Sequence, residues 1–279
     1  MAKIRIWIQI LFTALTNSYV QGIYKVDIYK GKFKSLCVPG LNCYSCPGAL
    51  GSCPIGALQS VIGDRKFNLS FYMMGFFLII GGFIGRFVCG WLCPFGLVQD
   101  LIYKIPFVKK INKFSWDKYL RWLKYIILLM FVIILPMFVV NFIGMGSPWF
   151  CKYICPSGTL TAGIPIVMGH SHFAEAAGFL FKWKLAILII SLFLSIIIYR
   201  PFCRYICPLG AIYGFFNPIA LFRFRIDETK CISCKKCERT CKFNIKVYEQ
   251  PNSFECIRCG DCKDVCPTKA IVMNKIKKS

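Results

Sequence analysis

Three apolar runs in this chain are long enough to cross a lipid bilayer, and they limit its fold more than any other feature. They cover residues 69–85, 122–143 and 185–199, the last with an apolar extension upstream at 179–181. A spanning helix needs about 20 mostly apolar residues, and each run approaches this once flanking aromatic and lysine residues are counted. With 57% hydrophobic residues, the chain is also more apolar than a soluble domain. The sequence therefore predicts an integral membrane protein.

A fourth, weaker run covers residues 4–20 and could instead be a signal peptide. It contains polar residues such as Arg5 and Gln9, and no A-x-A-like cleavage site follows it. We therefore expect a retained span, which makes four in total. In the third span along the chain, Pro136 is expected to produce a kink.

The distribution of basic residues predicts which side each loop faces. The segment between runs 69–85 and 122–143 is rich in lysine and arginine, whereas the next loop has little beyond Lys152, Lys182 and Lys184. The positive-inside rule places the first segment in the cytoplasm and the second outside. Residues 24–70 oppose this assignment, because they hold six basic residues and would lie outside. We expect a multi-pass protein of the cytoplasmic (inner) membrane with both termini in the cytoplasm.

The net charge of +23 suggests partners as well as location. Because the basic residues flank apolar runs, anionic lipid headgroups explain them better than nucleic acid does. Such a surface would also attract an acidic redox carrier, such as a ferredoxin or a flavodoxin-like protein.

After the last span the chain becomes polar and rich in cysteine. Two copies of C-x2-C-x2-C-x3-C follow one another, which is the spacing of bacterial ferredoxins with two [4Fe–4S] clusters. Since the fourth cysteine of each run serves the other cluster, one predicted ligand set is Cys231, Cys234, Cys237 and Cys266, and the other is Cys256, Cys259, Cys262 and Cys241. Zinc is the competing interpretation of C-x2-C pairs, but the doubled pattern favours clusters. The predicted division is a membrane domain at 1–222 and a cytoplasmic ferredoxin domain at 223–279.

The other ten cysteines belong to a repeat of the form C-x3-C-P-x-G. Full copies are centred on Cys89/Cys93, Cys151/Cys155 and Cys203/Cys207, and a looser copy at Cys53 is preceded by Cys37, Cys43 and Cys46. A helical C-x3-C places both thiols on one face. The proline ends that helix, and we expect the glycine to permit a tight turn into a re-entrant segment.

Sidedness separates these cysteines into two groups. Cys89, Cys93, Cys203 and Cys207 close two spans on the cytoplasmic side and could hold a third cluster. Cys37, Cys43, Cys46, Cys53, Cys151 and Cys155 lie toward the outside, where a further cluster, disulfides or another bound metal are all open alternatives. Redox-active thiols remain a further alternative for both groups.

Three arginines and a tryptophan lie near the predicted span ends, where they are expected to anchor the protein at the membrane interface; the arginines also have a functional alternative. Arg86, Arg200 and Arg204 could anchor the spans at the interface or stabilise anionic clusters. Trp91 is expected to be an interfacial anchor.

Four spans, C-x3-C-P motifs closing the second and fourth, and a double ferredoxin pattern together resemble the NapH-like polyferredoxin membrane proteins, in a wider group with the NosR and CcoG types. The resemblance covers nearly the whole chain. It implies that Cys89, Cys93, Cys203, Cys207 and the eight tail cysteines are cluster ligands. NapH-type members are regarded as electron donors on the quinol side of periplasmic reductases, and CcoG-type members act in copper reduction.

The predicted fold is thus an α-helical polytopic membrane protein of about four spans plus re-entrant segments, with a C-terminal α+β bacterial-type 2[4Fe–4S] ferredoxin domain. The predicted function is electron transfer between a cytoplasmic carrier and a quinone or extracytoplasmic acceptor, as a subunit of an oxidoreductase system rather than a stand-alone enzyme. Two alternatives stay open: a metal-handling assembly factor that reduces or delivers copper or another thiophilic metal, and an accessory scaffold.

Overall fold

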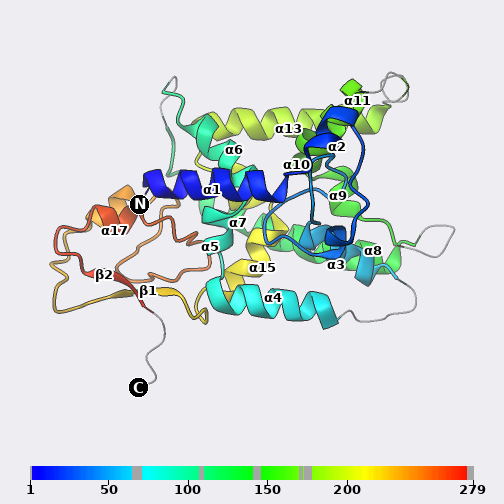
Figure 1. The fold of residues 1–279 in the computed structure, drawn as a ribbon. Coiled ribbons are helices and arrows are strands. Elements are labelled where there is room, and N and C mark those ends of the chain that lie inside the picture. Colours follow the sequence, from blue (N-terminus) through cyan, green and yellow to red (C-terminus); the bar gives the residue numbers. More distant parts are fainter. Residues whose placement is uncertain are drawn as a thin grey trace.

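Four long helical segments run side by side through the molecule. The computed structural model describes residues 2–64, 71–106, 110–140, 146–169, 172 and 178–274. The segments are α1 (Ala2–Thr16), α4 (Phe71–Ile84), the continuous stretch from α7 (Asp117–Ile127) to α8 (Leu135–Phe138), and α13 (Phe179–Ile197). Figure 1 shows that their axes are roughly parallel. The outermost predicted positions of two apolar runs, 69–70 and 141–143, lie outside the described residues.

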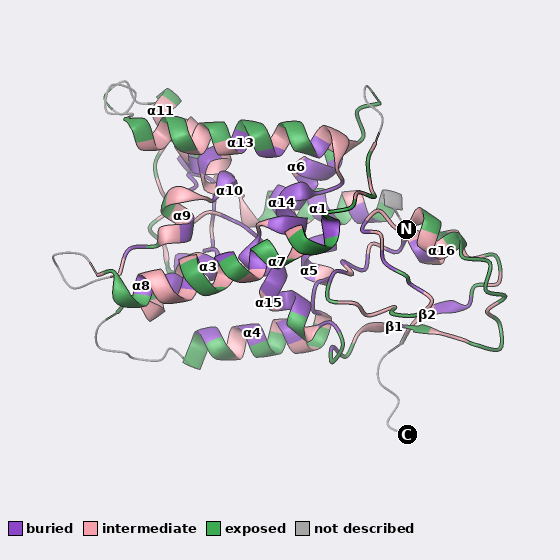
Figure 2. Cartoon of the chain, turned by 180° about the vertical axis from the view of Figure 1, so that it is seen from behind, coloured by how far each residue is buried: buried purple, intermediate pink, exposed green. Residues whose placement is uncertain are grey.

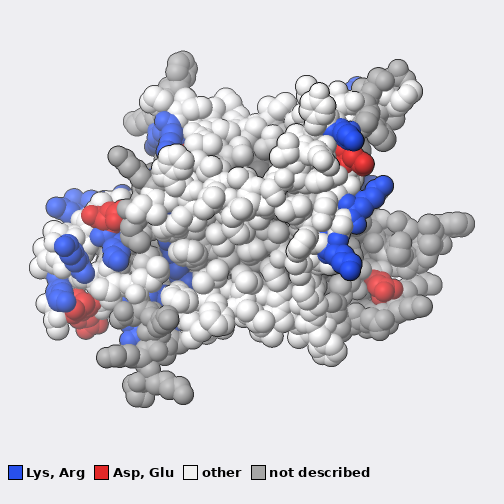
Figure 3. Space-filling model, viewed as in Figure 1, with Lys and Arg blue, Asp and Glu red and all other residues white. Residues whose placement is uncertain are grey.

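Two of these segments are long and apolar enough to cross a membrane. They are Asp117–Phe138 and Phe179–Ile197, whereas Ile4–Thr16 and Phe71–Ile84 are apolar but shorter. Their outward side chains are apolar as well: Leu129 is 54% exposed, Ile189 58% and Phe193 62%. In Figure 3 the charged residues gather toward the two ends, and no charged side chain is visible across the broad middle of this face. Such an exposed apolar band suits hydrocarbon rather than water.

The third long segment leaves α geometry where the sequence predicts a kink. A π-helix, η2 (Leu128–Ile134), connects α7 to α8 and ends two residues before Pro136. Proline has no N–H to donate to the preceding turn, and single π-turns are a recurrent cause of helix distortion.

Short helices that carry the cysteines fill the space between the long ones. They form the hairpin-like units α5 (Phe87–Trp91) with α6 (Pro94–Tyr103) and α14 (Pro201–Tyr205) with α15 (Pro208–Phe216). A third unit comprises α9 (Trp149–Tyr153), α10 (Pro156–Gly158), the π-helical η3 (Thr159–Gly163) and α11 (Ile164–Gly169). The looser fourth unit has α3 (Pro54–Ile62), and α2 (Val20–Lys25) and the 3-10 helix η1 (Lys32–Ser35) precede it. Figure 2 shows α5, α14 and α15 buried while α4 and α13 expose much of their surface.

The C-terminal segment packs against one end of the helical bundle (Figure 1). Its strands β1 (Arg223–Ile226) and β2 (Ile271–Asn274) pair antiparallel, with Arg223 opposite Asn274. Two short helices, α16 (Lys236–Thr240) and α17 (Asp261–Asp264), lie between the strands in sequence.

The two cysteine-rich loops of this segment repeat the same backbone shape. Ser233 and Arg258 each precede the second cysteine of a C-x2-C pair, and both have left-handed backbones with φ of 52°. Lys235 and Gly260 follow that cysteine, also with positive φ, at 55° and 86°. Non-glycine residues are uncommon in this region, so the matched pairs mark one loop geometry used twice.

Candidate iron–sulfur sites

Sixteen cysteines gather into four sets of four. The central set is Cys89, Cys93, Cys203 and Cys207, and the loop set is Cys43, Cys53, Cys151 and Cys155. The proximal tail set is Cys241, Cys256, Cys259 and Cys262, and the distal tail set is Cys231, Cys234, Cys237 and Cys266.

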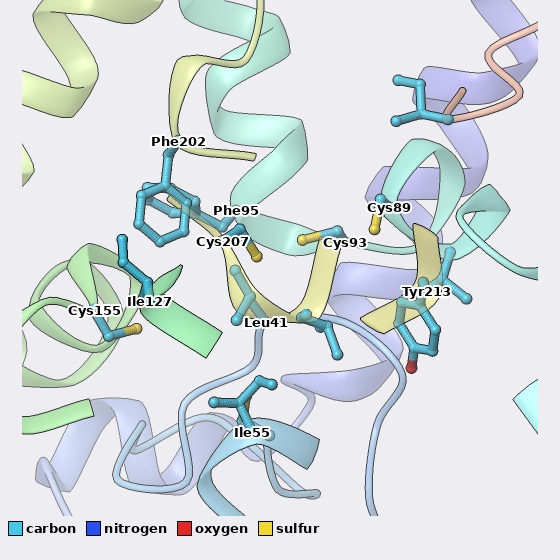
Figure 4. Packing of buried hydrophobic residues seen from close by; sticks show 14 of the residues in the cluster. Leu41, Ile55, Cys89, Cys93, Phe95, Ile127, Cys155, Phe202, Cys207 and Tyr213 are labelled. Carbon is cyan, nitrogen blue, oxygen red and sulfur yellow. The ribbon is translucent and has the colours of Figure 1, made fainter. Parts of the chain in front are cut away.

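The central set lies in the core, between two short-helix units that are far apart in sequence. Cys89 lies in α5 and Cys203 in α14, while Cys93 and Cys207 directly precede α6 and α15. All four side chains are at most 5% exposed. Burial raises the pKa of the Cys203 thiol to about 12, and the nearby thiols of Cys93 and Cys89 contribute to the rise. In Figure 4 the sulfur atoms of Cys93 and Cys207 point toward each other.

The Cys-Pro dipeptide explains how each unit presents its second thiol. Cys53, Cys93, Cys155 and Cys207 all occupy the N-cap of a helix in extended conformation, with proline as the first helical residue. Proline suits that position because its fixed φ matches the helix and the missing N–H is not needed there. The backbone N–H of Gly210 is therefore free to donate to the sulfur of Cys207, which counteracts the rise in pKa that burial causes.

In the two motifs of the central set, the glycine makes room for a buried arginine. A Cβ atom on Gly96 would lie 3.1 Å from Nη1 of Arg200, and one on Gly210 would lie 3.3 Å from Nη2 of Arg86. Both glycines lie within helices. The two arginines are exchanged between the units: Arg86 donates to the carbonyl oxygen of Cys203 at 3.2 Å, and Arg200 donates to that of Cys89.

The predicted anchoring of these arginines at the membrane interface is wrong. Arg86, Arg200 and Arg204 are all 0% exposed, so they reach no lipid headgroup. Each instead pairs with a buried carboxylate from a distant segment: Arg86 with Glu255 at 2.9 Å, Arg200 with Asp100 at 2.5 Å, and Arg204 with Asp117 at 2.6 Å. A buried charge is stable only with such a partner.

The loop set surrounds a cavity of about 690 Å³, which Lys152 and Lys184 also line. Burial raises the pKa of the Cys53 thiol to about 12, and Cys155 and Cys43 add to the rise. Nζ of Lys184 donates to the carbonyl oxygen of Cys151 at 3.2 Å.

The remaining two cysteines of the predicted outer group, Cys37 and Cys46, do not line this cavity. The sulfur of Cys37 lies 3.7 Å from both Ser52 Oγ and Met73 Sδ, and that of Cys46 lies 3.7 Å from Asn17 Oδ1. In the structure all 18 cysteines are free thiols, so the disulfide alternative for the outer group is not formed.

The loop and central sets lie within electrostatic range of each other. Burial raises the pKa of Cys155, and Cys93 of the central set contributes to that rise. Figure 4 shows Leu41, Ile127 and Phe202 packed around the two sets, and all three are buried. Cysteines of both sets therefore belong to the same hydrophobic core as these apolar side chains.

The tail cysteines lie in two neighbouring groups. Cys231, Cys234, Cys237 and Cys266 line one cavity. Burial raises the pKa of the Cys262 thiol, and the nearby thiols of Cys259, Cys256 and Cys241 raise it further. These four cysteines therefore lie close together and form the proximal tail set. Cys237 of the distal set contributes to the same rise, so the two tail sets are neighbours.

Arg86 connects the proximal tail set with the central set. Its guanidinium lowers the pKa values of both Cys89 and Cys256, against the effect of burial. At this junction the backbones of the bundle and the tail approach closely: a Cβ on Gly90 would lie 2.3 Å from the carbonyl oxygen of Ile257.

Trp91 is a docking residue and not the predicted interfacial anchor. It is 5% exposed, and its Nε1 donates to the carbonyl oxygen of Arg258 at 3.0 Å. The tail is therefore held on the bundle through hydrogen bonds between buried groups.

The sets fit an iron–sulfur cluster better than a single metal ion. Tetrahedral zinc with sulfur ligands at about 2.3 Å would hold its sulfurs within about 4 Å of one another. Among the described residues, no three His, Cys, Asp or Glu side chains converge closely enough for one ion. Buried cations and backbone N–H groups face the sulfurs, for example Arg86 near Cys89 and the N–H of Arg258 at Cys256. These are the groups that stabilise an anionic thiolate-ligated cluster.

The sequence analysis missed two polar side chains that reach the sulfurs. Gln99 and Gln59 each lie six residues after a Cys-Pro cysteine, and their amide nitrogens contact Cys203 and Cys151. The shared offset, C-P-x-G-x2-Q, is visible in the sequence at both places.

Comparison with known proteins supports the same chemistry. A family model described as "4Fe-4S binding domain" matches residues 69–113, 126–165 and 183–227, so that each match contains one full C-x3-C-P motif. A second model of the same description matches residues 250–272 in the tail. No solved structure matches the chain.

Three relatives illustrate the similarity. An uncharacterised protein of Methanocaldococcus jannaschii is 30% identical over 78% of this chain and 76% of its own length. The putative electron transport protein YccM of Escherichia coli is 26% identical over 72% of this chain and 54% of its own length. The ferredoxin-type protein NapH of Haemophilus influenzae is 29% identical over 70% of this chain and 63% of its own length. These similarities and the repeated cysteine motifs show that the chain belongs to the NapH-like polyferredoxin group of 4Fe-4S proteins.

Proposed function

We propose that this protein is a membrane-embedded electron conduit with four [4Fe–4S] sites, one for each set of cysteines. The observation that carries the proposal is a series of four sets: distal tail, proximal tail, central and loop. The distal and proximal tail sets lie within electrostatic range of each other, as do the central and loop sets, and the buried Arg86 lies near thiols of both the proximal tail set and the central set. A bound [4Fe–4S] cluster supplies reversible one-electron transfer. The residues of the chain bring the four sites together and surround the central site with apolar packing.

We propose a placement in the membrane that puts the apolar band within the bilayer. We assign four spans to α1, α4, α7–α8 and α13, which alternate in direction, so that the tail lies on the cytoplasmic side and the loop set near the opposite face. The exposed apolar side chains of these helices and the charged ends in Figure 3 support this assignment. The division at residue 222 then separates the embedded part from a cytoplasmic ferredoxin domain.

The distal tail set is suited to exchange electrons with a soluble carrier. Cys234 is exposed, and Lys235 and Lys236 line the same cavity. A basic rim of this kind attracts an acidic protein by electrostatic steering. A ferredoxin or a flavodoxin-like protein would fit that description.

At the other end, the cavity of the loop set is large enough for a small molecule. Its volume of about 690 Å³ lies within the range of ligand pockets. Electrons would therefore leave toward a quinone or an extracytoplasmic acceptor that approaches this cavity, or enter there if the flow is reversed.

A second candidate function is handling of a thiophilic metal such as copper. The Cys37–Met73 contact favours it, because thiolate and thioether sulfurs are the ligands that Cu(I) prefers. Stoichiometric copper binding that is lost in Cys37→Ser would support this function.

Replacing Cys203 and Cys207 together with serine tests the electron-conduit proposal. Low-temperature EPR of the reduced, anaerobically purified full-length protein should lose one cluster species and about four irons, while the tail species stay. The matched control is Cys37→Ser, which removes a thiol outside the four sets. A double variant that keeps its full iron content would contradict the assignment of the central set.

A further inference from the structure

Two buried glutamines contact one sulfur in each of the two sets within the bundle. Nε2 of Gln99, on α6, lies 3.2 Å from Sγ of Cys203 in the central set. Nε2 of Gln59, on α3, lies 3.2 Å from Sγ of Cys151 in the loop set. Both glutamines are 0% exposed.

The surroundings fix which end of each amide faces the sulfur. Nε2 of Gln99 also lies 3.4 Å from the carbonyl oxygen of Phe95, and Nε2 of Gln59 lies 3.3 Å from that of Ile55. A carbonyl oxygen can only accept a hydrogen bond, so the amide nitrogen must occupy that side. One N–H then points at the carbonyl and the other is available to the sulfur. For Gln59, Oε1 also accepts the backbone N–H of Phe150 at 3.0 Å.

The glutamines occur once per set. The equivalent position in the other two Cys-Pro units holds Thr161 and Tyr213, whose hydroxyls donate to the carbonyl oxygens of Ser157 and Pro39. Each glutamine extends from its own unit to the first cysteine of the partner unit, and this arrangement appears in both sets.

The stability of the fold does not account for Gln99. Its Oε1 is buried without a hydrogen-bond partner among the described residues, which costs free energy. A leucine would fill the same space without that cost. A neutral thiol is only a weak acceptor, so the amide gains a strong hydrogen bond only when the sulfur is an anionic ligand.

We propose that Gln99 and Gln59 set the reduction potentials of the central and loop sites, each by donating one N–H to a ligating sulfur. The inference rests on the proposed function. Reduction adds negative charge that spreads onto the thiolate ligands, and a hydrogen bond to such a ligand stabilises the reduced form more than the oxidised form. Removing the donor should therefore lower the reduction potential of its own site alone.

The test is an EPR-monitored redox titration of anaerobically purified full-length Gln99→Leu and Gln59→Leu. At a fixed ambient potential, we expect the ratio of reduced to oxidised central site to fall about tenfold in Gln99→Leu, which is 59 mV for one electron. Gln59→Leu should move only the loop site. Thr161→Val is the matched control, because this residue occupies the same position after a Cys-Pro cysteine and its hydroxyl donates to the carbonyl oxygen of Ser157 and not to a sulfur. It should leave every potential unchanged.

Several results would overturn the inference. It is wrong if both leucine variants keep wild-type potentials, or if the control variant shifts them equally. Gln99→Met, which keeps the side-chain length but has no N–H, must reproduce the fall and replaces Gln99→Leu if that variant does not fold. Wild-type protein that lacks clusters in the bundle would instead refute the proposed function, and its iron content distinguishes the two failures.

Discussion

Replacing Glu255 with alanine should loosen the tail from the bundle. Its Oε2 lies 2.9 Å from Nη1 of Arg86, and Oε1 forms an ion pair with Lys124. Arg86 and Lys124 are 0% exposed and Glu255 7%. The alanine variant would leave two buried cations without this carboxylate. Removing one partner of a buried pair costs about 3–5 kcal/mol of unfolding free energy.

The pKa of Glu255 gives a second value for the free energy that its ion pairs contribute to stability. Burial opposes ionisation, but Arg86 and Lys124 overcome this effect and lower the pKa from 4.5 to about 2. Since each pH unit by which the pKa is lowered corresponds to about 1.36 kcal/mol, the ionised Glu255 stabilises the folded state by about 3 kcal/mol. Because the folded-state pKa is the lower one, this contribution is present above pH 4.5 and is lost as the pH falls toward 2.

Hydrogen exchange of residues 223–274 in detergent or nanodiscs measures the effect. We expect faster exchange across the tail in Glu255→Ala at neutral pH, where Glu255 is ionised in the wild type. The matched control is Glu249→Ala, which removes an exposed ion pair with Lys246 and should leave exchange unchanged. Wild-type exchange in Glu255→Ala would refute the reasoning.

Two further predictions concern the tail. Gly90→Ala would place a Cβ 2.3 Å from the carbonyl oxygen of Ile257. This clash should loosen the tail, so that limited proteolysis releases it sooner than in the wild type. The control is Gly75→Ala, where a Cβ meets nothing within 4 Å, and it should behave as wild type. The double variant Lys235→Glu, Lys236→Glu should accept electrons more slowly from an acidic ferredoxin at low salt, and a rate equal to wild type in stopped-flow measurements would argue against a basic docking surface.

The grouping of the tail cysteines could be predicted from their spacing, and that of the central set from the predicted sidedness of the spans. Three cysteines in C-x2-C-x2-C reach one site from one loop, and a C-x3-C-P unit presents two thiols together. Grouping by the structure follows these patterns for the eight tail cysteines and for Cys89, Cys93, Cys203 and Cys207. That they ligate clusters remains a prediction.

Other features depend on contacts between distant segments and could not be predicted. Which four of the six outer cysteines meet depends on how residues 37–53 pack against α10, where Ser157 donates to the carbonyl oxygen of Leu41 and a Cβ on Gly158 would lie 3.3 Å from Sγ of Cys43. The burial of Arg86 and Arg200 depends on carboxylates at Glu255 and Asp100, far away in sequence. Basic residues at span ends usually face headgroups, so the positive-inside rule gave the wrong environment for these two.

Iron and acid-labile sulfide per chain in anaerobically purified full-length protein test the central claim most directly. Four sites of four irons each predict about sixteen irons and sixteen sulfides, and about twelve would mean that one of the two bundle sets is not a cluster site. A value of about eight would mean that only the tail is metallated, and would contradict the proposed conduit through the bundle.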